Sequence, residues 1–370
     1  MLTEPLAPYL LWAKMRRPAA IDLAGSNLLP CAIDDLPGAR AAVDISAPND
    51  NGFPPLVEAI ARHYGVTAAH VVSGTGCSGA NFVAIATLVG PGDEVLVEEP
   101  TYDPLIGACR LMGAAIRRLP RRFETRWRVD PDDVARLLTP QTRLVVLTSP
   151  HNPSGAIVPP ADLDAVGRAA ARVGAAVLVD EVYLDGANLA GAALAPTPSA
   201  GRLDGPFVAT SSLTKSYGLA GLRCGWIICH PEIAERGRRT RDVVENAGNA
   251  PGDRLGALAF AHLPALAERA RTLLAGNLAR MRAFFDAHPV LEVAAPPAAS
   301  VVFPRIAGVA DAGPFVQALL ERQGVAVAPG RFFGAPAHFR ISAAGRPDVL
   351  ERGLAGLHDA LASLQPSRVG

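Results

Sequence analysis

The stretch Thr210–Trp226, TSSLTKSYGLAGLRCGW, begins where one predicted strand, Phe207–Thr210, ends, and it leads into the next, Gly225–Cys229. It also holds Lys215, one of only two lysines among the 35 Lys and Arg residues of the chain. A primary amine can lose its proton and attack a carbonyl to form a Schiff base, whereas a guanidinium stays charged and cannot. Lys215 is therefore either a lysine that occurs by chance in an arginine-rich chain, as we interpret Lys14, or an amine that a catalysed reaction requires.

The chain around this stretch alternates between short branched apolar runs and Ala/Leu/Arg-rich segments of helical character. This alternation is typical of a mainly parallel sheet, and the continuous apolar runs VVLTS and AVLVD fit strands that are covered on both faces. We predict an α/β fold whose large domain has a mainly parallel seven-stranded sheet sandwiched by helices. The predicted strands are His70–Val72, Glu94–Glu98, Ala115–Leu119, Arg143–Leu147, Ala175–Asp180, Phe207–Thr210 and Gly225–Cys229.

The C-terminal part has a different pattern. A Gly-, Ala- and Pro-rich segment at Gly186–Gly205 lacks periodicity and is predicted to be a surface loop. A long helical pattern over Arg254–Ala287 precedes three short strand-like runs, Ser300–Phe303, Gly324–Ala328 and His338–Ser342. We therefore expect a smaller α+β domain. The predicted division is an N-terminal arm (residues 1–45) that joins the small domain, a large domain that carries the ligand site (46–250) and a C-terminal small domain (251–370).

Composition narrows the class of function. Zero formal net charge, 49% hydrophobic residues and 5% aromatic residues argue against a nucleic-acid face and against a disordered chain. The five cysteines are odd in number and lack CxxC spacing, which argues against a disulfide framework or a metal site and favours a reducing compartment. The basic residues near the N-terminus follow its short apolar run, opposite to a signal peptide, and no apolar stretch reaches membrane-spanning length. We expect a cytoplasmic enzyme with small-molecule partners.

A Gly-rich turn follows the first predicted strand in the segment VVSGTGCSGANFVAIA. At such a strand–turn–helix junction, backbone N–H groups can converge on a phosphate. Formally, Gly74-x-Gly76-x-x-Gly79 also matches the dinucleotide fingerprint, and Glu98 ends the next strand near the ribose-binding position. An NAD-type oxidoreductase and a purely structural tight turn are therefore the alternatives to a phosphate site.

Further polar groups follow other strands, at the edge where open α/β sheets bind their ligands. SPHNPSG places Asn152 between two prolines, although an ordinary turn has the same composition. Asp180 closes an apolar strand, where a carboxylate needs a partner unless it caps a helix. Ser212 and Arg223 flank Lys215 and can both bind a phosphate. A lysine, a phosphate cradle, a buried carboxylate and a rigid Asn together indicate a site for pyridoxal 5'-phosphate (PLP).

The ordered set SGTGCSGA, GDEVLVEEPTY, SPHNPSG, VDEVY, SSLTKSYGLAGLRCG and HFRIS, over about residues 50–345, resembles the class I/II aminotransferases of the fold-type I PLP enzymes. The resemblance implies that Lys215 forms the Schiff base with PLP and later moves a proton, and that Asp180 keeps the pyridine nitrogen protonated. It also implies that Tyr183 and Asn152 hydrogen-bond the phenolic oxygen and that Tyr102 stacks on the ring. The implied phosphate ligands are Gly76, Cys77, Ser78, Ser212 and Arg223.

The same resemblance covers the substrate side. Arg340 in HFRIS matches the arginine that grips the substrate α-carboxylate, a task that suits a planar fork. Gly25 best matches the segment that lies over the substrate, and Asn152 is a further candidate for binding the substrate. Many family members carry a tyrosine that reaches the phosphate of the neighbouring subunit, but here Ala47 stands at that position. A homodimer is implied by the family.

The expected function is the transfer of an amino group between an α-amino acid and a 2-oxo acid. Other fold-type I PLP reactions, namely those of carbon–sulfur lyases, decarboxylases and cyclases, use the same architecture and form the main alternative. An NAD-type oxidoreductase and a PLP-fold binding module without turnover are alternatives of other classes.

Overall fold

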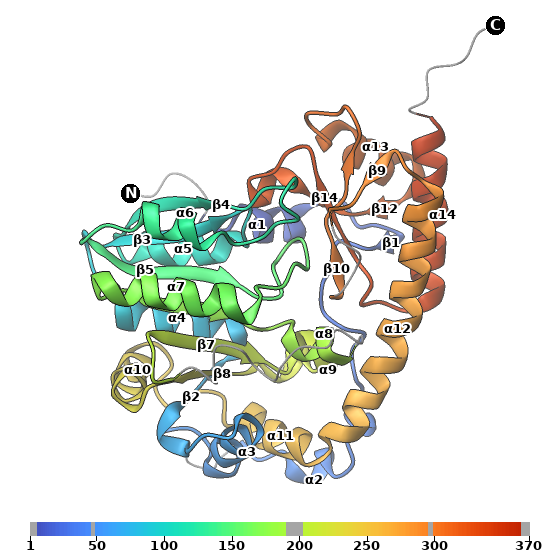
Figure 1. The fold of residues 1–370 in the computed structure, drawn as a ribbon. Helices are drawn as coiled ribbons and strands as arrows, with labels where there is room; N and C mark the ends of the chain where they lie inside the picture. Colours follow the sequence, from blue (N-terminus) through green and yellow to red (C-terminus); the bar gives the residue numbers. More distant parts are fainter. Residues whose placement is uncertain (1–5, 46–48, 190–202, 295–298, 364–370) are drawn as a thin grey trace, which may run out of the picture.

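The computed structural model of the chain describes residues 6–45, 49–189, 203–294 and 299–363. Its centre is a seven-stranded sheet with the order β2-β8-β7-β6-β5-β3-β4, in which β8 runs antiparallel to both neighbours and the other strands run in one direction. The mainly parallel α/β sheet predicted from the sequence is therefore confirmed (Figure 1). The strands are β2 (Val71–Thr75), β3 (Glu94–Glu99), β4 (Ala115–Pro120), β5 (Thr142–Thr148), β6 (Ala176–Asp180), β7 (Phe207–Ser212) and β8 (Cys224–Cys229).

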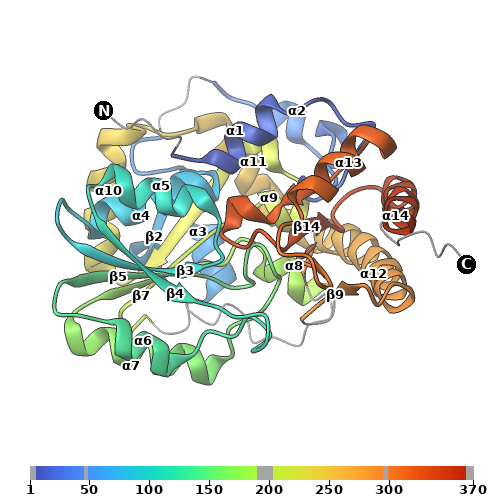
Figure 2. The same cartoon turned by 90° about the horizontal axis from the view of Figure 1, so that it is seen from above.

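Helices cover both faces of this sheet because successive side chains of a strand point to opposite faces, and in the central strands β3, β5 and β6 both sets are largely apolar. On β3, Val95 and Val97 pack in one buried cluster with residues of α4 (Gly76–Leu88) and α5 (Asp103–Leu111). Leu96, between them, packs in the opposite cluster with α6 (Pro131–Leu137) and α7 (Pro160–Val173). Figure 2 shows these helix pairs on the two sides of the sheet.

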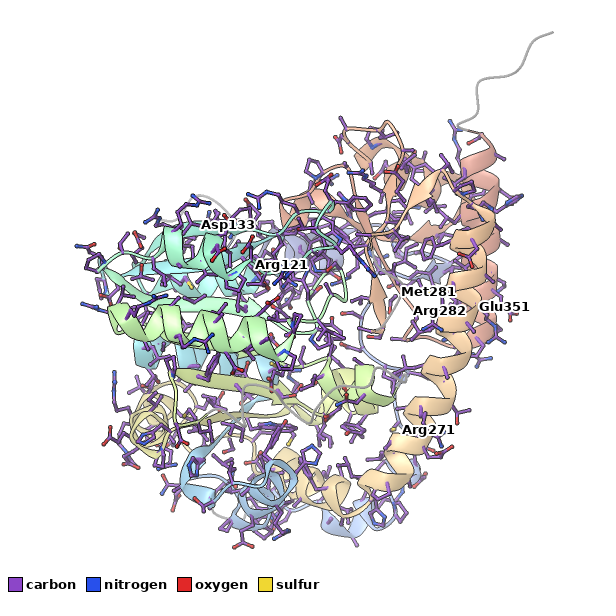
Figure 3. All side chains as sticks on the ribbon, viewed as in Figure 1. Arg121, Asp133, Arg271, Met281, Arg282 and Glu351 are labelled. Atoms are coloured by element: carbon purple, nitrogen blue, oxygen red, sulfur yellow. The ribbon has the colours of Figure 1, made fainter. Side chains whose placement is uncertain are left out.

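Further helices surround the sheet and the C-terminal part, and two consecutive ones lead from the sheet to the C-terminal part. The helical pattern predicted over Arg254–Ala287 is two helices, which meet at His262. On the second, Met281 is buried and Arg271 is exposed, so that this helix carries both a core face and a solvent face (Figure 3). These helices are α1 (Pro8–Met15), α2 (Ala39–Ala42), α3 (Pro54–Tyr64), α8 (Leu184–Leu189), α9 (Thr214–Tyr217), α10 (Pro231–Val244), α11 (Ala250–Ala261), α12 (Leu263–Ala287), α13 (Gly313–Gln323) and α14 (Pro347–Ala362).

The two ends of the chain meet in a second core. Strand β1 near the N-terminus pairs in parallel with β12, and β14 pairs antiparallel with β10 and β13. Leu23 shares a buried cluster with residues of α12, α13 and α14. The three short strand-like runs expected in the C-terminal part are thus present, the second of them as two strands, β12 and β13, and three strands, β1, β9 and β11, are additional. The short strands are β1 (Ile21–Asp22), β9 (Leu291–Glu292), β10 (Val301–Val302), β11 (Arg305–Ile306), β12 (Val325–Ala326), β13 (Ala328–Pro329) and β14 (Phe339–Ser342).

The loop predicted over Gly186–Gly205 is wrong at its start. Residues 184–189 form α8, and residues 190–202 lie outside the described residues. The backbone N–H of Gly186 donates to Ser216 Oγ at 2.9 Å, and Ala187 is fully buried. These tertiary contacts stabilise a helical turn that the low helix propensity of glycine disfavours.

No helix within the described ranges is both long and apolar enough to cross a bilayer.

Candidate active site

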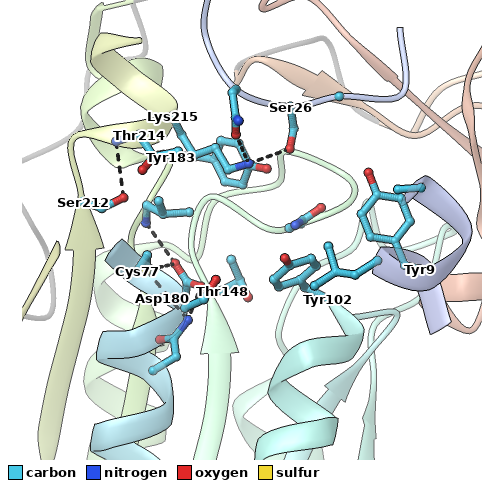
Figure 4. A pocket seen from close by; sticks show the side chains of 18 of the residues that line it. Tyr9, Ser26, Cys77, Tyr102, Thr148, Asp180, Tyr183, Ser212, Thr214 and Lys215 are labelled. Carbon is cyan, nitrogen blue, oxygen red and sulfur yellow. Dashed lines mark hydrogen bonds between the residues drawn. The ribbon is translucent and has the colours of Figure 1, made fainter. Parts of the chain in front are cut away.

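A cavity of about 300 Å³ opens at the carboxyl ends of β5, β6 and β7 (Figure 4). This is the edge at which an open α/β sheet places ligands. Ten of the residues predicted from the sequence line it: Gly25, Cys77, Ser78, Tyr102, Asn152, Asp180, Tyr183, Ser212, Lys215 and Arg223. Gly76 and Arg340 stand behind the wall, each in contact with a lining residue.

Lys215 lies in the first turn of α9, three residues after β7 ends, and its amine enters the cavity. Nζ donates to Ser26 Oγ at 2.8 Å and to Asn27 Oδ1 at 2.7 Å, and it lies 5.8 Å from the centre of the Tyr183 ring. Burial, and next the positive charge of Arg340, lower the pKa of Lys215 to about 7. A large fraction of this amine is therefore neutral, and thus nucleophilic, near neutral pH.

Asp180 ends β6 at the floor of the cavity and is 4% exposed. Its Oδ2 accepts from Asn81 Nδ2 at 2.8 Å, and its Oδ1 accepts from the backbone N–H of Val182 at 3.1 Å and from Cys77 Sγ at 3.3 Å. Burial raises the pKa of Asp180, although these donors and Lys215 act in the opposite direction. The carboxylate is thus held mainly by side chains from α4. These contacts would not be needed if Asp180 only capped a helix.

Asn81 is a residue that the sequence analysis missed. Its Oδ1 accepts from Thr210 Oγ1 at 2.5 Å while its amide nitrogen donates to Asp180, so both ends of the amide are engaged. It is buried inside α4, one turn after Cys77. An isolated Asn within a helix carries no motif, and only the pairing of α4 with β6 reveals its partner.

The start of α4 forms a tight cradle. Gly76 has φ +69°, and a Cβ there would clash with Arg223 Nη2. The backbone N–H of Gly76 donates to the Arg223 carbonyl at 2.8 Å, and Arg223 Nη2 donates to Thr75 O at 3.3 Å. A guanidinium and the N-terminus of a helix thus meet beside Ser212, and both favour an anion.

Replacement of Gly76 by alanine is expected to weaken PLP binding about tenfold or more. The added Cβ displaces the Arg223 guanidinium, which is expected to bind the phosphate. The left-handed backbone costs a non-glycine residue about 1–3 kcal/mol of stability, a cost that the control variant shares. A fluorescence titration of the cofactor-free protein with PLP measures the change. Gly174→Ala is the matched control, because Gly174 has φ +74° with no atom within 4 Å of its added Cβ. Equal affinity of Gly76→Ala and Gly174→Ala would contradict the assignment of the cradle.

Two aromatic residues and an amide face the centre of the cavity. Tyr183 is buried, and Ser26 is a weak hydrogen-bond partner of its hydroxyl. Burial raises the pKa of Tyr183 to about 12, so the hydroxyl keeps its proton and can donate it. Tyr102 lies at the opposite wall (Figure 4), and Asn152 Oδ1 accepts from Arg340 Nη1 at 2.7 Å.

Arg340 is fully buried on β14. Its Nη2 donates to Tyr9 Oη at 2.6 Å and to the carbonyl of Ala24 at 2.8 Å. Tyr9 belongs to α1 and Ala24 to the segment after β1, so the N-terminal arm supplies two partners that the sequence analysis missed. Sequence separations of more than 300 residues leave no local signal for such contacts.

The position of Glu98 argues against a dinucleotide site. Glu98 is fully buried, and its Oε2 accepts from Arg121 Nη1 at 2.7 Å. Its Oε1 accepts from the backbone N–H of Thr148 at 2.8 Å. Glu98 therefore stabilises the end of β5, and its carboxylate is not available to a ribose.

The donor set fits PLP. The Gly76–Arg223 cradle suits a phosphate, and the Tyr183 hydroxyl keeps a proton that it can donate. A buried carboxylate and an amine with a lowered pKa face the same cavity. These are the groups that define the site of a PLP-dependent enzyme.

Comparisons with known proteins agree. The family model described as aminotransferase class I and II matches residues 22–357, and the chain therefore belongs to this family. Capreomycidine synthase of Streptomyces vinaceus is 34% identical over 294 residues, which cover 79% of this chain and 75% of that protein. A crystal structure of a PLP-dependent aminotransferase from Streptococcus suis superposes with a TM-score of 0.90 at 25% identity and full coverage of both chains. The PLP-dependent cyclase OrfR superposes with a TM-score of 0.83 at 26% identity, with 98% of each chain covered. The protein is a PLP-dependent transferase of the aminotransferase class.

Proposed function

We propose that this cavity binds PLP at Lys215 and moves an amino group between an α-amino acid and a 2-oxo acid. The observation that carries the proposal is the position of the Lys215 amine and the Asp180 carboxylate on one cavity with the Gly76–Arg223 cradle. When bound, PLP supplies an electron-accepting ring that takes up the electrons of a broken Cα–H bond.

The residues around the ring would divide this work. Asp180 would pair with the pyridine nitrogen, because a carboxylate held by three donors stabilises a positive charge in a buried place. Tyr183 and Asn152 would bind the phenolic oxygen, and Tyr102 would cover the ring. The phosphate would be held by Gly76, Cys77, Ser78, Ser212 and Arg223.

Arg340 would bind the substrate carboxylate. The guanidinium of Arg340 already donates to two neutral oxygens, Asn152 Oδ1 and Tyr9 Oη. An incoming carboxylate would replace a neutral acceptor with a charged one, which forms a stronger hydrogen bond. Gly25 lines the same side of the cavity without a side chain, which leaves room above the substrate. Lys215 would then take the α-proton of the substrate and return it in a later step of the reaction.

A single-turnover experiment distinguishes transamination from the alternative. The similarity to the cyclase OrfR favours a cyclisation as the second candidate. The PLP-loaded protein is mixed with each common α-amino acid and no 2-oxo acid. We expect one equivalent of 2-oxo acid per site, because the amino group stays on the enzyme until an acceptor is added. We also expect a visible absorbance change that reverses on adding pyruvate or 2-oxoglutarate. Many equivalents of product without an acceptor would instead indicate a lyase, decarboxylase or cyclase.

The family resemblance also supports a homodimer, with the arm (1–45), the large domain (46–250) and the small domain (251–370) in each subunit. Ala47, where many family members place a tyrosine that crosses between subunits, lies outside the described residues. Five free cysteines fit a reducing compartment and support a cytoplasmic location. Light scattering of the active protein is expected to give twice the 38.5 kDa of one chain. An active species with the mass of one chain would contradict the dimer.

A further inference from the structure

The amine of Lys215 is held by two neighbouring residues of the N-terminal arm. Ser26 Oγ accepts at 2.8 Å and Asn27 Oδ1 at 2.7 Å (Figure 4 labels Ser26 beside Lys215). A neutral primary amine has two N–H bonds and one lone pair. The two acceptors engage both N–H bonds, so that the lone pair is the only position on the nitrogen at which a proton can be accepted.

The segment that supplies these acceptors is fixed on both sides. Before it, the Ala24 carbonyl accepts from Arg340 Nη2 at 2.8 Å, and the backbone N–H of Leu23 donates to Ala326 O at 2.9 Å. After it, the backbone N–H of Leu29 donates to Ala344 O at 2.7 Å, and Leu28 is fully buried. Ser26 itself is only 8% exposed. Both acceptors are therefore presented by a restrained backbone, so their geometry can orient the amine.

Ser26 and Asn27 are neutral, and the charges around the amine come from other elements. Arg340 on β14 and Arg223 before β8 disfavour the ammonium form, whereas Asp180 on β6 and Cys77 on α4 favour it. The Tyr183 ring lies below the amine. The charged neighbours set how much of the amine is neutral, but none of them accepts a hydrogen bond from Nζ among the described residues.

We propose that Ser26 and Asn27 are positioning residues that hold the Lys215 amine by its N–H bonds and aim its lone pair at the substrate proton. In that step Nζ takes the proton, the electron pair of the Cα–H bond is left to the bound cofactor, and the same amine later returns the proton. The inference rests on the proposed function, because the proton in question is that of an amino-acid substrate. Sequence similarity alone points only to Gly25 in this segment.

The first test uses the cofactor-free protein, in which Lys215 and Lys14 are the only side-chain amines. The rate of acetylation of Lys215 is followed by mass spectrometry as a function of pH. Hydrogen bonds to an ammonium favour the charged form, so Ser26→Ala and Asn27→Ala are expected to lower the pKa of Lys215. Asn27→Asp places a carboxylate beside the amine and is expected to raise that pKa by about one unit or more. Ser26→Thr keeps the hydroxyl and is expected to preserve the wild-type value.

The second test follows the proton directly in the PLP-loaded protein. The exchange of the α-proton of an amino donor with deuterium in the solvent is measured by NMR. The Ser26→Ala/Asn27→Ala double variant is expected to exchange about 10- to 100-fold more slowly, with KM within about twofold of wild type, because the base is misdirected while the substrate contacts stay. Ser26→Thr with wild-type Asn27 is expected to retain the exchange rate.

The outcomes separate this inference from the proposed function. If the double variant keeps both the exchange rate and the pKa of Lys215, positioning by Ser26 and Asn27 is overturned, although a cofactor attached to Lys215 still supports the proposed function. A slower exchange in the double variant, together with the wild-type exchange rate in Ser26→Thr, supports the inference. If the wild-type protein attaches no PLP at Lys215, both proposals fail.

Discussion

Replacement of Lys215 by arginine or alanine is expected to lower turnover by ~10³-fold or more. Arginine keeps the charge but has no proton to lose near neutral pH, and alanine removes the nucleophile and the base together. The variants are expected to fold and to take up PLP without covalent attachment, because the cradle at Gly76 and Arg223 is unchanged. Turnover and the absorbance spectrum after gel filtration measure the two effects.

The chain offers a matched control for this change. Lys14→Arg alters the only other lysine, which is exposed on α1, and is expected to leave turnover within about twofold of wild type, as surface substitutions usually do. A Lys215→Arg variant that turns over like Lys14→Arg would show that the conspicuous lysine is a chance survivor.

Replacement of Asp180 by asparagine is expected to lower turnover by ~10²- to 10³-fold. The amide has nearly the same shape but no charge, so it cannot hold a proton on the ring nitrogen, and loss of one preorganised electrostatic partner has about this effect. The measured quantities are kcat, and the affinity for PLP, which the phosphate cradle should largely preserve.

Asp162→Asn is the matched control for this change. Asp162 is also buried and pairs with Arg128 at 2.7 Å, but on α7, away from the cavity. We expect it to affect stability and to leave kcat within about twofold of wild type. If Asp180→Asn loses no more turnover than Asp162→Asn, the carboxylate does not act on the cofactor.

Much of the site could be predicted because its residues end strands. The parallel strands β5, β6 and β7 are buried on both faces, so their apolar runs are conspicuous, and their carboxyl ends necessarily meet at one edge. Asp180 and Lys215, which follow two neighbouring strands, could therefore be placed at one cavity from the sequence. Gly76 could be predicted as part of a phosphate site because small residues between a strand and a helix let backbone N–H groups converge on an anion, whereas its contact with Arg223 could not.

The remaining partners could not be predicted from local patterns. Ser26 and Asn27 reach Lys215 across 189 and 188 residues, and Tyr9 reaches Arg340 across 331. Such contacts arise because the N-terminal arm pairs with β12 near the other end of the chain, and two-residue strands carry almost no periodicity. Helix α8 was missed for a related reason, since its stability comes from contact with Ser216 and not from its own sequence.

Borohydride reduction of the PLP-loaded protein shows which amine carries the cofactor, and we expect this amine to be that of Lys215. Reduction fixes PLP to the amine that bears it, and with only two lysines in the chain a peptide map leaves no ambiguity. We expect the added mass of one reduced PLP on the peptide that contains Lys215 and none on that of Lys14. Stoichiometric label on Lys14, or complete loss of PLP after reduction, would rule out attachment of the cofactor at Lys215.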